Sequence, residues 1–197
     1  MYNNLGKKLS KDEIQEYFQL LNNELKSLNK HGQLLICGGA ALTLVYNARD
    51  STQDIDGIFE PKETFRKIIK KISSENNLAD DWLNDGAKGF ISANMTSSVI
   101  QSFSHLTVSS IDPEPLLAMK LASSRFYGMD KSDSLFLMEK LNIQNKQQLF
   151  NILNTYIPKD RLIPKVEYFT ELCYNEYIIK KQDRSKQKGS CKKNKCR

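Results

Sequence analysis

The segment from Leu34 to Phe59 decides the fold; its sequence is LLICGGAALTLVYNARDSTQDIDGIF. It opens with an apolar run typical of a short buried strand, and the pair Gly38-Gly39 follows as a turn signal. Residues 40–46 predict a helix, and residues 54–59 predict a second strand. Strands that alternate with helices in this way are typical of an α/β domain.

Capping and periodicity predict the elements around this unit. The sequence Ser10-Lys11-Asp12-Glu13 is a capping box and predicts a helix that runs to about residue 30. Pro61 predicts the first position of another helix, and apolar runs at 99–101 and 106–108 predict two paired strands. Only helices are predicted beyond residue 111, with the ranges 112–126, 130–141, 145–156 and 164–179.

The fold class that follows is α/β (α+β), a small mixed sheet with flanking helices, followed by an all-helical C-terminal half. We expect an α/β core over residues 1–111, a helical region over 112–181 and a basic, disordered tail over 182–197. A chain of 197 residues buries about two-thirds of its unfolded surface, so it is long enough to form a hydrophobic core.

The positive charge of the chain is concentrated at its end. The formal net charge is +6, but nine basic residues and a single acid lie from Lys180 to Arg197, which leaves 20 basic and 22 acidic residues elsewhere. Such a tail can bind phosphate backbones, or it can simply be solvated and disordered. With no apolar run near ~20 residues and no signal region, we expect a cytoplasmic protein without a membrane contact.

The four cysteines predict no metal site. Cys37 and Cys173 lie in apolar runs, where a free cysteine behaves as a small buried hydrophobe. Cys191 and Cys196 lie in the tail without a second pair of ligands nearby, and zinc needs about four.

Two acids and two glycines are the residues that carry chemistry. Asp54 and Asp56 are two apart on a predicted strand, so their carboxylates face the same way, about 6–7 Å apart. A hard cation such as Mg²⁺ relieves their repulsion, and substrate phosphates complete its shell. Gly38 and Gly39 would let a phosphate approach backbone N–H groups at a helix start. An acid pair alone is usually part of a solvated face, and a glycine pair alone is usually an ordinary turn. Together, the two pairs predict a nucleoside triphosphate site.

The run from Gly38 to Asp56 resembles the signature of the polymerase-beta-like nucleotidyltransferase superfamily. It is most similar to the small bacterial branch of toxin-type and uncharacterised members (AbiEii-like and MenT-like). That branch has a glycine pair, a short helix and Arg-x-Thr-x-Asp-hydrophobic-Asp, which here is Arg49-Asp50-Ser51-Thr52-Gln53-Asp54-Ile55-Asp56 with one more residue between Arg and Thr. The resemblance continues in a helix with Lys120 and Arg125, then Asp130-Lys131-Ser132-Asp133.

The resemblance implies a nucleotidyltransferase-type fold and transfer of an NMP group from an NTP to a hydroxyl on RNA, tRNA or protein. It also implies a role in a toxin–antitoxin or phage-defence system, with a cognate antitoxin or other partner protein. It implies Mg²⁺ or Mn²⁺ as the metal. The metal ligands would be Asp54 and Asp56; the catalytic residues Asp54, Asp56, Lys120 and Asp133; and the nucleotide-binding residues Gly38, Gly39, Arg49, Thr52, Lys120 and Arg125.

Other interpretations of these residues stay open. Asp130 and Asp133 are typical of a helix start, with Asp130 as its N-cap. Lys120 can cover the edge of a core with its stem, and Arg125 can simply face solvent. Ala40 stands where superfamily members usually have Ser, and the strand at 106–108 lacks the usual third acid. These departures favour a rival hypothesis, a catalytically degenerate protein that binds nucleic acid or protein.

Overall fold

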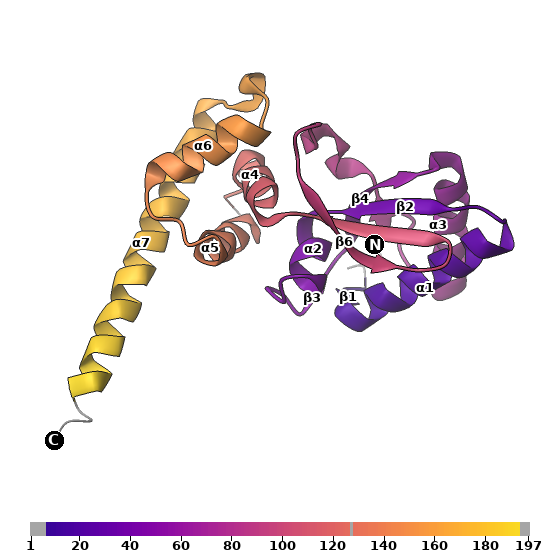
Figure 1. Ribbon diagram of the computed structural model, residues 1–197, viewed down its shortest axis with the longest axis horizontal. Coiled ribbons are helices and arrows are strands. Elements are labelled where there is room, and N and C mark those ends of the chain that lie inside the picture. Colours follow the sequence, from indigo (N-terminus) through magenta and orange to yellow (C-terminus); the bar gives the residue numbers. More distant parts are fainter. Residues whose placement is uncertain (1–6, 127, 194–197) are drawn as a thin grey trace, which may run out of the picture. The chain divides into compact units, whose positions relative to one another are not determined.

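The computed structural model describes residues 7–126 and 128–193, with side chains up to Arg184. The chain divides into two compact units, Met1–Asp112 and Pro113–Arg197, which are drawn in Figure 1. The first unit contains the sheet, and the described part of the second contains helices only.

A five-stranded mixed sheet forms the centre of the first unit. Its central strand pairs antiparallel with one neighbour and parallel with the other. The outer pairs are parallel on one side and antiparallel on the other, so the sheet is mixed. The strand order is β5 (Leu83–Asn84), β4 (Ile55–Glu60), β2 (Gly32–Ile36), β7 (Leu106–Ile111) and β6 (Ser97–Ser102).

Two amphipathic helices, α1 (Lys11–Ser27) and α3 (Lys62–Asn76), contact each other and the strands, as Figure 1 shows. The predicted capping box is confirmed, because the Glu13 N–H donates to Ser10 Oγ at 3.3 Å and the Ser10 N–H donates to Glu13 Oε2 at 2.9 Å. Pro61 is the N-cap of α3, so this helix begins one residue later than predicted. The core lies between these helices and the sheet.

Short elements complete the first unit. The helix α2 (Gly38–Leu44) follows β2, and β1 (Leu9–Ser10) pairs with β3 (Ser51–Thr52). A 3-10 turn, η1 (Gly86–Phe90), follows β5. The strands β1, β3 and β5 are only two residues long, which is below what an alternating pattern can reveal in a sequence.

The second unit is built around α4 (Pro113–Ser123), which contacts three other helices. Its residues 115–121 are all buried, as expected for a helix with apolar side chains on every face. The three helices around it are α5 (Asp130–Lys140), α6 (Lys146–Tyr156) and α7 (Pro164–Lys193); a 3-10 turn, η2 (Lys159–Arg161), precedes α7.

The predicted fold class is confirmed: a mixed sheet with flanking helices precedes a helical region. The helix predicted over 112–126 is shorter, because Ser124 has a φ of 43° that ends α4 at Ser123. Asp112 lies before α4, and its Oδ1 accepts a hydrogen bond from Ser98 Oγ. The α7 backbone continues to Lys193, through most of the segment 182–197 for which composition predicts disorder.

Cys37 and Cys173 are confirmed as buried free cysteines. Burial raises the pKa of the Cys173 thiol to about 12. The side chains of Cys191 and Cys196 fall outside the described residues. No helix in the described part of the chain has the length and apolar character needed to cross a membrane.

Candidate functional site

Gly38 is the first residue of α2 and lies directly against Asp56. The strand β2 leads into Cys37, whose N–H donates to the Asp56 carbonyl oxygen at 2.9 Å. Gly38 has a φ of 60°, and a Cβ placed on it would lie 2.7 Å from Asp56 Oδ2. The backbone conformation therefore disfavours a side chain here, and the nearby carboxylate leaves no room for one. The glycine pair was predicted as a turn before a helix at residue 40, but it forms the first turn of that helix.

Gly39 brings two further side chains to the same helix start. A Cβ on Gly39 would overlap Thr52 Oγ1 and lie 3.1 Å from Arg49 Nη1. Thr52 is buried and is fixed by the pairing of β3 with β1, in which it stands opposite Leu9. The glycines thus allow Arg49, Thr52 and Asp56 to converge on the first turn of α2.

The two acids lie on one face of the sheet edge. Asp54 precedes β4 and Asp56 lies within it; both are half-buried, while Ile55 and Gly57 between and after them are buried. This alternation places both carboxylates on the same face of the strand. Asn84 Nδ2 donates to Asp54 Oδ2 at 3.3 Å, and Asn84 stands opposite Asp56 in the β4–β5 pairing.

The carboxylate oxygens of Asp54 and Asp56 suit a hard divalent cation. Carboxylate and amide oxygens are the groups that Mg²⁺ prefers, and it is usually held by one or two carboxylates together with substrate phosphates. The absence of a side chain at Gly38 keeps space beside Asp56 Oδ2. Among the described residues, no group of three or more His, Cys, Asp or Glu is placed to hold a metal, so the protein's own carboxylates here are the pair Asp54 and Asp56.

A second set of predicted residues meets in the helical unit. Lys120 is 8% exposed, and its Nζ lies 2.9 Å from Asp130 Oδ1 and 3.0 Å from Asp133 Oδ2. Asp130 Oδ2 also accepts hydrogen bonds from Ser123 Oγ at 2.5 Å and Arg125 Nε at 2.7 Å. We call these five residues the Lys120 cluster.

Two interpretations of the cluster residues are wrong. Asp130 does not cap α5, because Met129 is the N-cap and has no side-chain cap bond; the Asp130 carboxylate is bonded to α4 and to Arg125. Lys120 does not lie at the edge of a core, because its ammonium is buried between two carboxylates. Arg125 does face solvent, since its side chain is 70% exposed, but its Nε is held by Asp130.

The surroundings of Asp130 favour the ionised form of its carboxylate. Burial raises the pKa of Asp130, but the positive charge of Lys120, hydrogen bonds from Ser123 and Lys120, and the charge of Arg125 outweigh it. The net effect is a pKa below the ordinary value of 3.8. Asp130 therefore stays charged, linking the buried ammonium of Lys120 to the exposed guanidinium of Arg125.

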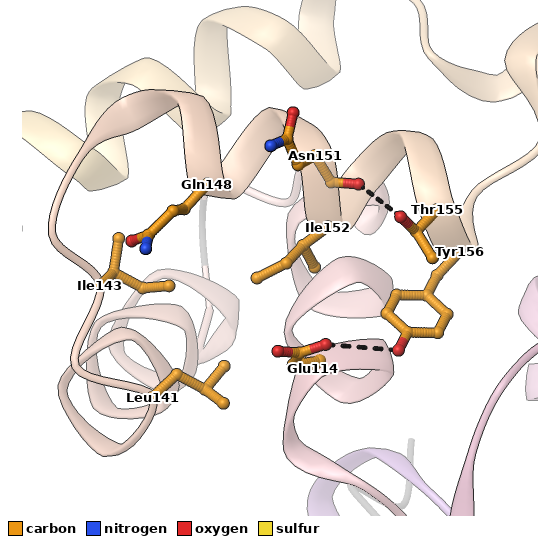
Figure 2. A pocket seen from close by; sticks show the side chains of 8 residues that line it. All are labelled: Glu114, Leu141, Ile143, Gln148, Asn151, Ile152, Thr155 and Tyr156. Carbon is orange, nitrogen blue, oxygen red and sulfur yellow. Dashed lines mark hydrogen bonds between the residues drawn. The ribbon is translucent and has the colours of Figure 1, made fainter.

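A separate cavity of about 280 Å³ lies in the helical unit (Figure 2). Its only side chain that is charged at neutral pH is Glu114, whose Oε2 accepts a hydrogen bond from the Tyr156 hydroxyl at 3.3 Å. A wall whose single charge is negative does not suit a triphosphate. The remaining lining residues are Leu141, Ile143, Gln148, Asn151, Ile152 and Thr155.

Sequence reasoning missed two residues of these sites. One is Asn84, which lies two residues after Trp82, a core residue whose ring is 5.1 Å from that of Tyr17. Asp130 was assigned to a helix start rather than to the centre of a charge cluster. A polar residue that ends a two-residue strand carries no pattern of its own, so only the pairing with β4 reveals Asn84.

The family comparison now bears on both sets of residues. The chain belongs to the family of nucleotidyltransferases of unknown function (DUF6036), whose model matches residues 15–161. The match includes the Gly38–Asp56 segment and the whole Lys120 cluster, and it ends before α7. The class of protein is thus a nucleotidyltransferase family, and the toxin-type branch is not part of what the match shows.

The crystal structure of an antigenic nucleotidyltransferase-like protein from Paracoccidioides brasiliensis is similar over 77% of this chain and 96% of its own, with 16% identity and a TM-score of 0.43. A likeness this distant carries no information about activity. No curated protein matches the sequence.

Proposed function

We propose that this protein transfers an NMP group from a magnesium-bound NTP to a hydroxyl group of RNA or protein. The observation that carries the proposal is that Asp56 lies against Gly38 at the start of α2, with Asp54 on the same face of its strand. The family membership supports it independently.

In the first unit, Asp54 and Asp56 would hold Mg²⁺ or Mn²⁺, with Asn84 fixing Asp54 through its amide. When bound, the cation would supply neutralisation of the phosphate charge. The backbone at Gly38 and Gly39 would leave room for the triphosphate. Thr52 in β3 and Arg49 in the loop before β3 would contact it. Arg49 can do so bidentately, as a guanidinium binds phosphate.

Within the Lys120 cluster, Arg125 is the cation whose side chain faces solvent, and we assign it to phosphate binding. Lys120 and Asp133 were expected to be catalytic. Because Lys120 is already paired with both Asp130 and Asp133, we assign these residues to positioning and charge balance around Arg125.

The reaction would join the acceptor hydroxyl oxygen to the α-phosphorus and break the bond to the departing pyrophosphate. Positioning and electrostatic stabilisation account for most of the catalysis in transfers of this kind. Ala40 has no hydroxyl, so backbone N–H groups of the first turn of α2 would serve in place of the usual serine.

The test is incubation with each α-labelled NTP, Mg²⁺ and total tRNA, with label read in RNA and in the protein. The matched variant is Asp54→Asn/Asp56→Asn, which keeps side-chain size and removes the charges. We expect label that disappears in the variant. Label that persists in the variant contradicts the assignment of these two acids, and its location identifies the acceptor class.

A second candidate function is a catalytically degenerate binding protein. It is favoured by Ala40 and by the lack, among the described residues, of a third acid grouped with Asp54 and Asp56. Calorimetry discriminates the two, because only the enzyme requires NTP binding that depends on Mg²⁺. Neither label nor such binding would leave the binding protein; metal-dependent binding without label would point to a missing acceptor.

The cellular role also belongs to the proposal. A transferase of this type could act in a toxin–antitoxin or phage-defence system, with a cognate antitoxin or other protein as its partner. Co-expression with neighbouring open reading frames, scored as relief of a growth defect caused by the wild type but not by Asp54→Asn/Asp56→Asn, tests it.

A further inference from the structure

Three aromatic side chains pack against one another from the core of the helical unit to its surface. Phe169 of α7 is fully buried, and the ring of Phe126, in the α4–α5 connection, packs edge-on against it at 5.1 Å. The ring of Tyr168 lies 5.9 Å from that of Phe126, tilted by 34°. Phe126 is 36% exposed and Tyr168 is 62% exposed. We call Phe126 and Tyr168 the aromatic platform.

Two cations flank the platform. Lys165 Nζ lies 5.9 Å from the centre of the Phe126 ring, and Lys165 precedes Tyr168 by three positions, about one turn of α7. Arg125 is adjacent to Phe126 in sequence, and Asp130 holds its Nε while most of the side chain faces solvent. Glu171, one turn after Tyr168, is paired with Lys146 at 2.8 Å, so part of its charge is balanced.

This combination favours one class of partner. An exposed aromatic ring held in place by a second ring offers a surface for stacking at low entropic cost, and every unpaired base has a matching face. Cations at the edge of the platform suit the phosphates on either side of a stacked base. An apolar protein surface would gain nothing from Lys165 and Arg125, which it would have to desolvate.

We propose that the aromatic platform binds single-stranded RNA, with an unpaired base stacked on Tyr168 and neighbouring phosphates at Lys165 and Arg125. The inference deepens the proposed function, on which it rests for the role of that RNA as acceptor. Binding itself requires neither NTP nor metal. The platform lies at the start of α7, so this contact is separate from any contact made by the basic segment after Lys181.

The test is the affinity of the full chain for a short fluorescent single-stranded RNA, measured by anisotropy without nucleotide. Tyr168→Leu should weaken binding about 10-fold, because it keeps an apolar side chain but removes the stacking face. Tyr168→Phe should bind like the wild type. Ile179→Ala is the matched control, since Ile179 is a 59% exposed apolar residue of the same helix, and it should leave binding unchanged.

Two further measurements sharpen the test. Lys165→Gln should reduce the slope of log affinity against log salt by about 0.7, as expected for one lost phosphate contact with a single strand. The matching RNA duplex, whose bases are already stacked, should bind more weakly than the single strand. Circular dichroism of each variant checks that the helical fold is intact.

Equal affinities of Tyr168→Leu and the wild type would overturn the inference, as would a wild type that binds no RNA; either result would leave a protein as the alternative occupant of the platform. Equal losses in Tyr168→Leu and Ile179→Ala would also overturn it, because stacking would not be the cause. A wild type that binds RNA through Tyr168 but shows neither label nor Mg²⁺-dependent NTP binding contradicts the proposed function and leaves this inference intact.

Discussion

Gly38 shows how one residue can serve both a backbone turn and a binding site. Its φ of 60° lets β2 turn directly into α2, and its missing side chain lets Asp56 Oδ2 come close to the helix start. Both requirements favour glycine at this position. The glycine is therefore tied to the position of the carboxylate as well as to the fold.

Gly38→Ala should destabilise the protein by about 1–3 kcal/mol, because alanine is strained at this φ, and should also abolish Mg²⁺-dependent NTP binding by displacing Asp56. Gly128→Ala is the control, since Gly128 has a φ of 114° but no atom within 4 Å of an added Cβ. Thermal unfolding and calorimetry measure the two effects. Loss of NTP binding in both variants would show that strain alone is responsible.

Lys120 is the most buried cation among the described residues of the helical unit. Lys120→Met should destabilise the protein by about 3–5 kcal/mol, because it leaves Asp130 and Asp133 buried without their cation. Lys146→Met, which removes a half-exposed ion pair with Glu171, should cost about 1 kcal/mol or less. Denaturant unfolding compares them. Similar losses would contradict the view that Lys120 balances a buried charge cluster.

At the scale of elements, the Asp130 carboxylate joins α5 to the end of α4 through Lys120 and Ser123. The connection between these helices contains Ser124 and Gly128, both with positive φ. The ion pairs of Lys120 join the two helices across this connection. This link should weaken when the carboxylate is protonated.

The pH dependence follows from the lowered pKa of Asp130. A carboxyl whose folded pKa lies below its unfolded value binds its proton more tightly when unfolded, so its contribution to stability is complete above about pH 4 and is lost as the pH falls through the folded pKa. Asp130→Asn should therefore show less loss of stability with acid than the wild type. Thermal unfolding between neutral and acid pH measures this, and parallel profiles would contradict it.

The sequence predicts the long elements well and the short ones poorly. The periodic apolar faces of α1 and α3, with Ser10 and Pro61 near their starts, carry enough signal for their ends to fall within a few residues. The strands β1, β3 and β5 have two residues each and form only because a partner strand is present. The contact of Asn84 with Asp54 depends on that pairing, which no local pattern encodes.

The same contrast between local patterns and tertiary contacts applies to the candidate site. Asp54, Asp56 and the two glycines were predicted from their order along the chain, because they lie within one strand–helix–strand unit. The ion pairs of Lys120 were not predicted, because they join residues of two helices across a connection with unusual backbone angles. Which carboxylate pairs with which cation is a tertiary property.

At the scale of the whole molecule, charge is unevenly distributed along the chain. Removing residues 182–197 removes seven basic residues and one acid, and so brings the formal net charge from +6 to zero. We expect this truncation to weaken RNA binding and to flatten its salt dependence. The preference for single strands should persist, because Tyr168 lies outside the removed segment. Loss of that preference would assign single-strand recognition to the tail.

The central position of α4 also sets the rates at which the helical unit exposes its backbone to solvent. Because α5, α6 and α7 all contact α4, its amide hydrogens can exchange with deuterium only when most of the unit opens at once. The amides of residues 117–121 should therefore be the slowest of this unit to exchange, and the unfolding free energy derived from them should report the opening of all four helices together.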